Sequence, residues 1–299
     1  MNEKHIQPLG KRISNPEKYP RRIRILKYQY NDCPYLISSF PRCGRTWVKY
    51  FLGYYIAKNY KVKFTQRLEV DRFSFFAKNS YKPCNIPLIL FRHDYLSVVG
   101  NIPWEEYFNI VKKNKLLFEE EMEQQKIIYL FRDPIDVLFS YWPYLQGIPY
   151  KNFECPEHKN IISFAGEKYW GMDSIINFMN LQLDHHDKHN WNKLRQEKHK
   201  KLIVKYETLK QGDKEWKKII NFIFEKFNEE AFEYAKEQTT WNKLRQENNI
   251  DVPEKLTFFR KGGSNYINEL PKERQKILLN WPGLAKLNER IKKNYDLYC

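Results

Sequence analysis

The chain has 299 residues, 42% hydrophobic and 16% aromatic, and its 52 Lys and Arg residues outnumber 36 Asp and Glu residues to give a formal charge of +16. This composition excludes a disordered chain, and only 11 glycines and 15 prolines exclude a collagen-like one. The sequence has no run of about 18 uncharged apolar residues, and its basic start lacks a signal peptide's apolar core, so we expect a cytoplasmic protein without a membrane span. The length fits one domain over residues 1–299, with a basic extension (1–30) and a folded core (31–299).

Four short apolar runs predict the buried strands of a parallel sheet, at residues 35–39, 87–91, 127–131 and 202–205. Two segments have apolar residues at the spacing of one buried helix face. These faces consist of Val48, Phe51, Leu52, Tyr55 and Ile56, and of Trp216, Ile219, Ile220, Ile223 and Phe227. Alternating strands and helices predict an α/β fold, a doubly wound parallel sheet flanked by helices, in a single domain.

The loop after the first strand, residues 38–47 (SSFPRCGRTW), is typical of an anion site. A tight turn at Gly44 and a helix starting near Thr46 place backbone N–H groups and the positive helix end around an anion, and Arg42 adds charge. The loop is P-loop-like, but Ser39 replaces the first Gly of GxxxxGK[ST] and Arg45 replaces the Lys. These replacements disfavour an ordinary NTPase.

A second strand–helix junction follows the third strand, at residues 126–142 (KIIYLFRDPIDVLFSYW). Asp133 is a typical N-cap, Pro134 is a typical first helical residue, and Asp136 lies in the first turn. Arg132 precedes this helix and Ser140 lies two turns along it, which predicts a second anion site. Because ligands bind beyond the carboxyl ends of parallel strands, the two sites predict one ligand with two separated anionic groups.

These motifs resemble those of the cytosolic-type sulfotransferases, in particular bacterial small-molecule sulfotransferases. FPRCGRTW is similar to the family's 5′-phosphosulfate loop, YLFRDPIDVLFSYW to its 3′-phosphate motif, and FFRKGG at residues 258–263 to its late RKG motif. The three occur in family order over residues 30–290. The resemblance implies a catalytic core that moves a sulfuryl group, by in-line displacement, from 3′-phosphoadenosine 5′-phosphosulfate (PAPS) to a hydroxyl, or an amine, of a small-molecule acceptor. The product nucleotide is adenosine 3′,5′-bisphosphate (PAP), and no metal is required.

The resemblance also implies roles for individual residues. Arg42 takes the place of the lysine that binds the bridging oxygen of the donor, and His93 takes the place of the general base. Ser140 has a catalytic role beside Arg42 and, with Arg132, binds the 3′-phosphate. The other implied donor-binding residues are Cys43, Gly44, Arg45, Thr46 and Trp47 of the loop, Tyr206, Thr239, Thr240, Trp241 and Leu244 near the nucleoside, and Phe258, Phe259, Arg260, Lys261 and Gly262 of the RKG motif.

The chain departs from the family pattern in four places. Arg42 replaces Lys, which keeps the charge and changes its geometry. Cys43 and Arg45 replace Ser and Thr, so two side-chain hydroxyls are lost while the backbone N–H groups remain. Phe91 stands where the family has the lysine of its KTH motif, and the segment after RKG is one residue shorter.

Residues between the second and third strands bear on the acceptor. Several aromatic residues there can form a pocket, although core packing explains them equally well. Glu105, Glu106 and Glu119–Glu121 add negative charge, which favours a polar or cationic small molecule. As partners we expect no nucleic acid and no membrane, and the sequence leaves monomer or homodimer open. The aromatic set is Phe73, Phe75, Phe76, Trp104, Tyr107 and Phe108.

Other interpretations remain open. One is a nucleotide kinase with a degenerate P-loop; another is a non-enzymatic nucleic-acid-binding protein that uses the +16 charge, although no basic stripe interleaved with aromatics is present. The five cysteines form no CxxC pair, which disfavours a disulfide framework or a zinc ribbon. Residues 184–189 (DHHDKH) hint at metal binding, but a hydrophilic loop or frayed helix end explains them better, so we expect no metal.

Overall fold

The computed structural model describes residues 35–61, 86–87, 89–92, 126–147, 160–167, 171–193, 201–248 and 265–296. The basic extension and the start of the core, residues 1–34, lie outside this part. The elements in chain order are β1 (Tyr35–Ser39), α2 (Arg45–Tyr60), β2 (Ile89–Arg92), β3 (Lys126–Phe131), α5 (Pro134–Gly147), α6 (Ile161–Ala165), α7 (Met172–Lys193), β4 (Lys201–Lys205), α8 (Tyr206–Gln211), α9 (Asp213–Ile223), α10 (Glu229–Gln238), α11 (Trp241–Asn248), the 3-10 helix η4 (Tyr266–Glu269), α12 (Lys272–Leu279) and α13 (Leu284–Asp296).

The four described strands form one parallel sheet in the order β2-β1-β3-β4. β1 is central: Ile37 lies opposite Phe91 of β2 and Ile128 of β3. All three strand pairs are parallel, so the carboxyl ends of the strands lie at the same edge of the sheet. The predicted parallel sheet is therefore confirmed, and the two loops identified in the sequence leave neighbouring strands at that edge.

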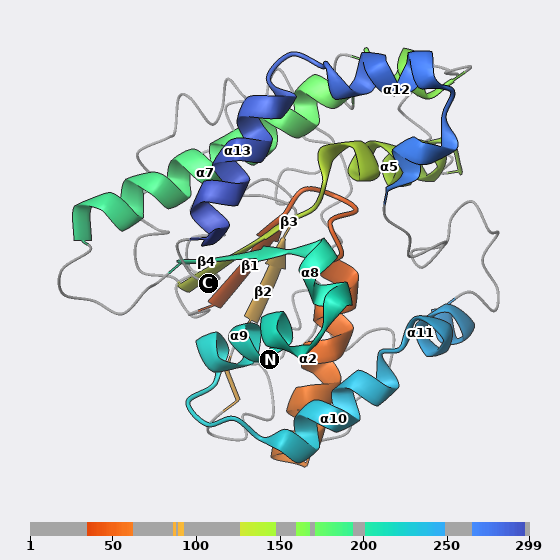
Figure 1. Cartoon of the computed structure of the whole chain (residues 1–299). Helices are drawn as coiled ribbons and strands as arrows, with labels where there is room; N and C mark the ends of the chain where they lie inside the picture. The colour runs from red at the N-terminus through yellow and green to blue at the C-terminus, as the bar shows by residue number, and fades with distance from the viewer. Residues whose placement is uncertain are drawn as a thin grey trace, which may run out of the picture.

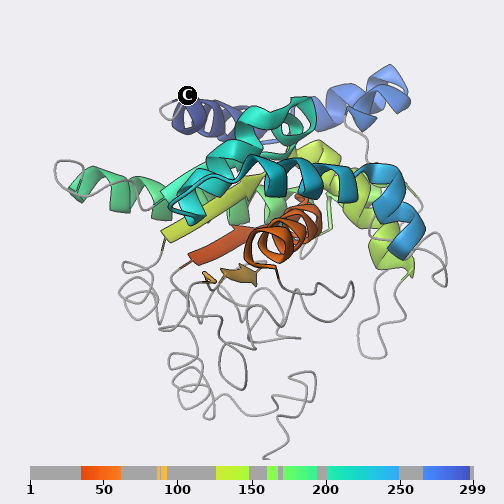
Figure 2. The same ribbon diagram turned by 90° about the horizontal axis from the view of Figure 1, so that it is seen from below.

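Helices cover both faces of the sheet, as expected for a doubly wound α/β fold (Figure 1). α7 and α13 pack on one face, and α5 packs against α7. α2, α8, α9 and α10 lie on the other face, where α2 and α10 make the most extensive helix–helix contact. Figure 2 looks onto the sheet from below, with α2 in front of the strands.

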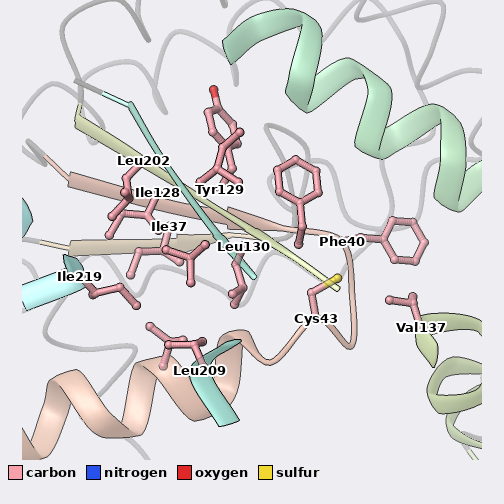
Figure 3. Packing of buried hydrophobic residues seen from close by; sticks show 14 of the residues in the cluster. Ile37, Phe40, Cys43, Ile128, Tyr129, Leu130, Val137, Leu202, Leu209 and Ile219 are labelled. Carbon is pink, nitrogen blue, oxygen red and sulfur yellow. The ribbon is translucent and has the colours of Figure 1, made fainter. Parts of the chain in front are cut away.

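The core lies on both sides of the central strands. Ile37, Leu130 and Val204 are buried, and apolar side chains of the flanking helices meet them (Figure 3). The predicted buried face of α2 is confirmed, since all five of its members are buried. The predicted face of α9 is too long: the extended backbone of Phe224 ends the helix at Ile223, and Phe227 packs against the core from outside it.

Two boundary predictions also change. β2 covers Ile89–Arg92 rather than residues 87–91, so Arg92 is the last residue of the strand instead of following it. Residues 184–189 lie inside the 22-residue helix α7, and they are neither a loop nor a frayed end. Arg290 of α13 forms ion pairs with Asp184 and Asp187 there, at 2.8 and 2.9 Å. The acidic residues of this segment therefore join α7 to α13.

Candidate functional site

The β1–α2 loop requires glycine at position 44 for two reasons. Gly44 is the N-cap of α2 and has φ 90°, a left-handed conformation that favours glycine. A Cβ atom at this position would lie 2.4 Å from Cδ2 of Tyr206. Because Gly44 has no side chain, α2 starts without a side-chain cap, and its first-turn N–H groups form the kind of helix N-terminus that binds anions.

Tyr206 joins this loop to two other elements. Tyr206 is the first residue of α8, directly after β4, and its buried ring lies against Gly44. The Arg132 guanidinium carbon is 4.5 Å from the centroid of the same ring, and the Trp47 ring contacts it edge-on. Burial raises the pKa of the Tyr206 hydroxyl, and the charge of Arg132 partly offsets this. Tyr206 thus packs between the ends of β1, β3 and β4.

Two hydrogen bonds link the β1–α2 loop to the β3–α5 junction. Arg132 Nη1 donates to the Arg42 carbonyl oxygen at 3.0 Å, and Arg42 Nε donates to Ser140 Oγ at 3.1 Å. Arg42 has φ 71°, which costs a residue with a side chain on the order of 1–3 kcal/mol. The bond from Arg132 to the Arg42 carbonyl stabilises this strained turn. The two basic residues therefore lie side by side at the edge of the sheet.

The β3–α5 junction uses its side chains to cap the helix. Asp133 Oδ1 accepts from the backbone N–H groups of Ile135 and Asp136, which confirms the predicted N-cap. Glu207 Oε1 accepts from the Asp133 N–H at 2.9 Å. Burial raises the pKa of both carboxyl groups. Because the Asp133 carboxylate already occupies the start of α5, an anion in this region would be held by the side chains of Arg132 and Ser140.

Cys43 lies on the inner side of the loop. Its side chain is fully buried, and Figure 3 shows it within the apolar cluster near Phe40 and Leu130. Burial raises the pKa of the thiol, with the charge of Arg132 acting in the opposite direction. The position at which the family has Ser therefore serves packing here, and the backbone N–H of Cys43 donates to the Phe40 carbonyl oxygen at 3.4 Å.

Among the predicted nucleoside-binding residues, Trp47 of α2 contacts both Tyr206 and Thr239. Trp47 Nε1 donates to the Thr239 carbonyl oxygen at 3.1 Å, while the Thr239 hydroxyl donates to the Ala235 carbonyl oxygen at 2.7 Å and closes α10. The carbonyl oxygen of Thr240 accepts from the N–H of Leu244 at the start of α11. Leu244 is fully buried and Trp241 is half-buried, and both pack with the core.

Both strand–helix junctions lie within a match to a known protein family. A family model described as "Sulfotransferase domain" matches residues 32–280. The chain belongs to the sulfotransferase family. Forty-six chains of solved structure match this sulfotransferase, among them the mouse sulfotransferase SULT7A1 complexed with PAP, with 18% identity, 87% of this chain and 89% of that chain covered, and a TM-score of 0.49. No curated protein sequence matches it.

Several predicted residues of this sulfotransferase lie outside the described residues. They are His93, the acceptor-side aromatic and acidic residues, and Phe258, Phe259, Arg260, Lys261 and Gly262 of the RKG motif. Within the described ranges, no cluster of three or more His, Cys, Asp or Glu side chains is suited to a metal ion. Across those same ranges, no helix is long and apolar enough to span a bilayer.

Sequence reasoning missed the roles of two acidic residues. The sequence pattern places Asp136 only in the first turn of a helix and gives no role to Glu207. The structure gives both a backbone partner far away in the sequence: Glu207 binds the N–H of Asp133, and Asp136 binds the N–H groups of Asn265 and Tyr266. The one available signal was the presence of acidic residues beside two basic motifs.

Proposed function

We propose that this sulfotransferase uses PAPS as donor and sulfates a hydroxyl, or an amine, of a small-molecule acceptor. Membership of the family supports sulfuryl transfer in general. The finer proposal rests on the direct link between Arg132, Arg42 and Ser140. These two hydrogen bonds join two strand–helix junctions, each of which has the chemistry of an anion site. PAPS carries one anionic group for each of them.

In this proposal the two ends of the donor bind at different junctions. The β1–α2 loop, with the N–H groups of Gly44, Arg45 and Thr46, holds the 5′-phosphosulfate. Arg132 and Ser140 bind the 3′-phosphate together with Arg260, Lys261 and Gly262 of the RKG motif. The nucleoside binds between these ends, beside the side chains of Trp47, Tyr206, Thr239, Thr240, Trp241 and Leu244.

The proposed reaction is an in-line displacement at sulfur. The acceptor oxygen, or nitrogen, forms a bond to sulfur as the bond from sulfur to the bridging oxygen of the donor breaks. The proton of the acceptor passes to His93, since a histidine with a pKa near its reference value of about 6.5 can act as a base at neutral pH. The electron pair of the broken bond stays on the phosphate of PAP, where Arg42 stabilises the developing charge.

Ser140 has a second role in this mechanism. Its hydroxyl accepts from Arg42 Nε at 3.1 Å, and the same hydroxyl is proposed to bind the 3′-phosphate. A donor that engages Ser140 would change the position of Arg42. Binding at one end of the donor therefore prepares the arginine that acts at the other end.

The proposed acceptor is a polar or cationic small molecule. Support comes from the sequence, where Glu105, Glu106 and Glu119–Glu121 lie between β2 and β3 despite the basic overall charge. A screen of amine-bearing, neutral and acidic acceptors with radiolabelled donor sulfate tests this. We expect the highest kcat/KM for cationic or neutral polar acceptors, and a preference for acidic ones would contradict the proposal.

Calorimetric titration with PAP tests the donor, with ADP and ATP, each without and with magnesium, as controls. We expect micromolar binding of PAP that does not require magnesium. Preference for ATP with magnesium would support the nucleotide kinase, and absence of any nucleotide binding combined with a salt-sensitive gel shift would support nucleic-acid binding.

Two variants test the residue roles. Arg132→Ala is expected to weaken PAP more than AMP, which lacks the 3′-phosphate; an equal loss for both nucleotides would contradict a 3′-phosphate role. His93→Ala is expected to abolish turnover while PAP affinity stays within about twofold of wild type, because a general base contributes typically 10²–10⁴-fold to the rate. Retained turnover in single-turnover kinetics would exclude His93 as the base.

A further inference from the structure

Asp136 is a buried carboxylate whose partners lie far away in the sequence. The residue is 2% exposed. Oδ2 accepts from the backbone N–H of Asn265 at 2.9 Å, and Oδ1 accepts from that of Tyr266 at 3.0 Å. The Tyr266 ring also stacks on Phe139 of α5, with centroids 6.0 Å apart and an interplanar angle of 25°. The start of η4 is therefore fixed to α5 through both a polar and an apolar contact.

The caps of α5 explain why Asp136 has this arrangement. With Asp133 as N-cap, Asp136 is the third residue of the helix, the position at which an acidic side chain often accepts the N–H of the N-cap. Here Glu207 accepts that N–H instead. The carboxylate of Asp136 turns to the N–H groups of the distant segment, and two charge-assisted hydrogen bonds offset the cost of burying its charge.

Two features of the chain connect this contact to the donor site. Asp136 and Ser140 are four residues apart on α5, so they share one face of the helix. In the sequence, only two residues separate Gly262 of the RKG motif from Asn265. The segment that Asp136 holds therefore follows the RKG motif closely in the sequence.

We propose that Asp136 is a positioning residue of the donor site, which holds the Asn265–Tyr266 backbone against the helix that carries Ser140. The inference rests on the proposed function. It assigns Asp136 an effect on binding of the 3′-phosphate without contact between its carboxylate and the nucleotide. The carboxylate suits this role because each of its two oxygens takes one of the N–H groups, whereas an amide in the same place would face one of them with its NH₂ group.

Asp136→Asn tests the proposal, with PAP and AMP as paired ligands. The amide keeps the shape of the side chain and one acceptor, but its NH₂ group faces the second backbone N–H. We expect PAP affinity to fall about tenfold, as for loss of a hydrogen bond to a charged group, and AMP affinity to change less than about twofold. Isothermal titration calorimetry measures both, and thermal unfolding of the unliganded variant reports its stability.

Asp173→Asn is a matched control. Asp173 Oδ1 accepts from Trp281 Nε1 at 2.7 Å, so it also ties the C-terminal segment to a helix, α7, in a contact that involves none of the proposed donor-binding residues. We expect this variant to bind both nucleotides as wild type does. Phe139→Leu removes the ring stacking on Tyr266 while keeping Asp136, and serves if Asp136→Asn does not fold. It is expected to weaken PAP selectively by about two- to threefold.

The outcomes separate the inference from the proposed function. A selective loss of PAP affinity in Asp136→Asn, or in Phe139→Leu where Asp136→Asn does not fold, supports the inference. Unchanged PAP affinity, or equal losses for PAP and AMP, overturns it and leaves Asp136 a purely structural residue. If wild-type protein itself does not prefer PAP to AMP, the proposed donor fails, and the inference fails with it.

Discussion

The two strand–helix junctions of the candidate site begin their helices in opposite ways. At β1–α2 the N-cap is Gly44, which has no side chain to place at the helix end. At β3–α5 the N-cap is Asp133, whose carboxylate accepts two N–H groups of the first turn. Both junctions follow neighbouring strands of the same sheet, so position alone does not explain the difference.

In the proposed function, the two junctions are therefore two different kinds of anion site. α2 offers its backbone and helix dipole to an anion, and a close aromatic ring requires glycine at the cap. α5 carries its own carboxylate at that end, so only the side chains of Arg132 and Ser140 remain. The sequence predicted an anion site at both junctions, but at α5 it assigned the cap to Asp133 and the anion to Arg132 and Ser140, and the cap is confirmed.

The largest expected effect comes from Gly44→Ala. The new Cβ would meet the buried Tyr206 ring at 2.4 Å at a residue with φ 90°, so we expect a loss of about 3 kcal/mol or more in the free energy of unfolding and loss of PAP binding. Urea unfolding and calorimetry measure these. Gly283→Ala is the control: φ is 80°, but its Cβ would lie 3.6 Å from Ile176, so only about 1–2 kcal/mol is expected and PAP affinity stays. Similar stability losses in both variants would contradict the role of the Tyr206 contact.

A smaller effect is expected from Asp133→Ala, which tests the β3–α5 junction. Loss of the cap should lower the free energy of unfolding by about 1 kcal/mol. PAP affinity should change less than about threefold, because the α5 backbone does not bind the anion in this scheme. Urea unfolding and PAP titration check both values. A variant with wild-type stability and strongly weakened PAP binding would show that the start of α5 faces the nucleotide.

The smallest expected effect is a pH dependence of stability caused by Glu207, whose carboxylate accepts from the Asp133 N–H at the β3–α5 junction. Burial raises the pKa of Glu207 above its unfolded value, so the native state binds this proton more readily and the charged form costs stability at neutral pH. Glu207→Gln keeps the acceptor for Asp133 but cannot titrate. Its stability relative to wild type should therefore be highest near neutral pH and should decrease as the pH falls through the native pKa of Glu207.

Urea unfolding from about pH 7 to about pH 4.5 measures this trend. Glu230→Gln is a control of opposite sign, because the Lys58 ion pair on the surface lowers the pKa of Glu230. Wild type should be the more stable protein of that pair at neutral pH, should keep its advantage down to about pH 4.5, and should lose it only below that pH, where Glu230 becomes protonated in the native state. The same trend in both variants would show that Glu207 does not carry a burial penalty.

Much of the fold was predictable because its signals are local. Short apolar runs gave the strands within two residues, and the spacing of apolar residues gave the buried face of α2. Asp133 and Pro134 marked the start of α5, since a cap acts within its own turn. The end of α9 was missed because the apolar spacing continues to Phe227 after the backbone has become extended at Phe224.

The sequence by itself determined the parallel α/β sheet, the two loops at its edge and the family to which the chain belongs. Only the tertiary structure decided that Cys43 points into the core, that Tyr206 packs on Gly44 and that Arg132 binds the Arg42 carbonyl. It also decided the partners of Asp136, which are about 130 residues away along the chain. Strand, cap and helix patterns depend on residues within a few positions of one another, whereas these contacts depend on which elements fold side by side.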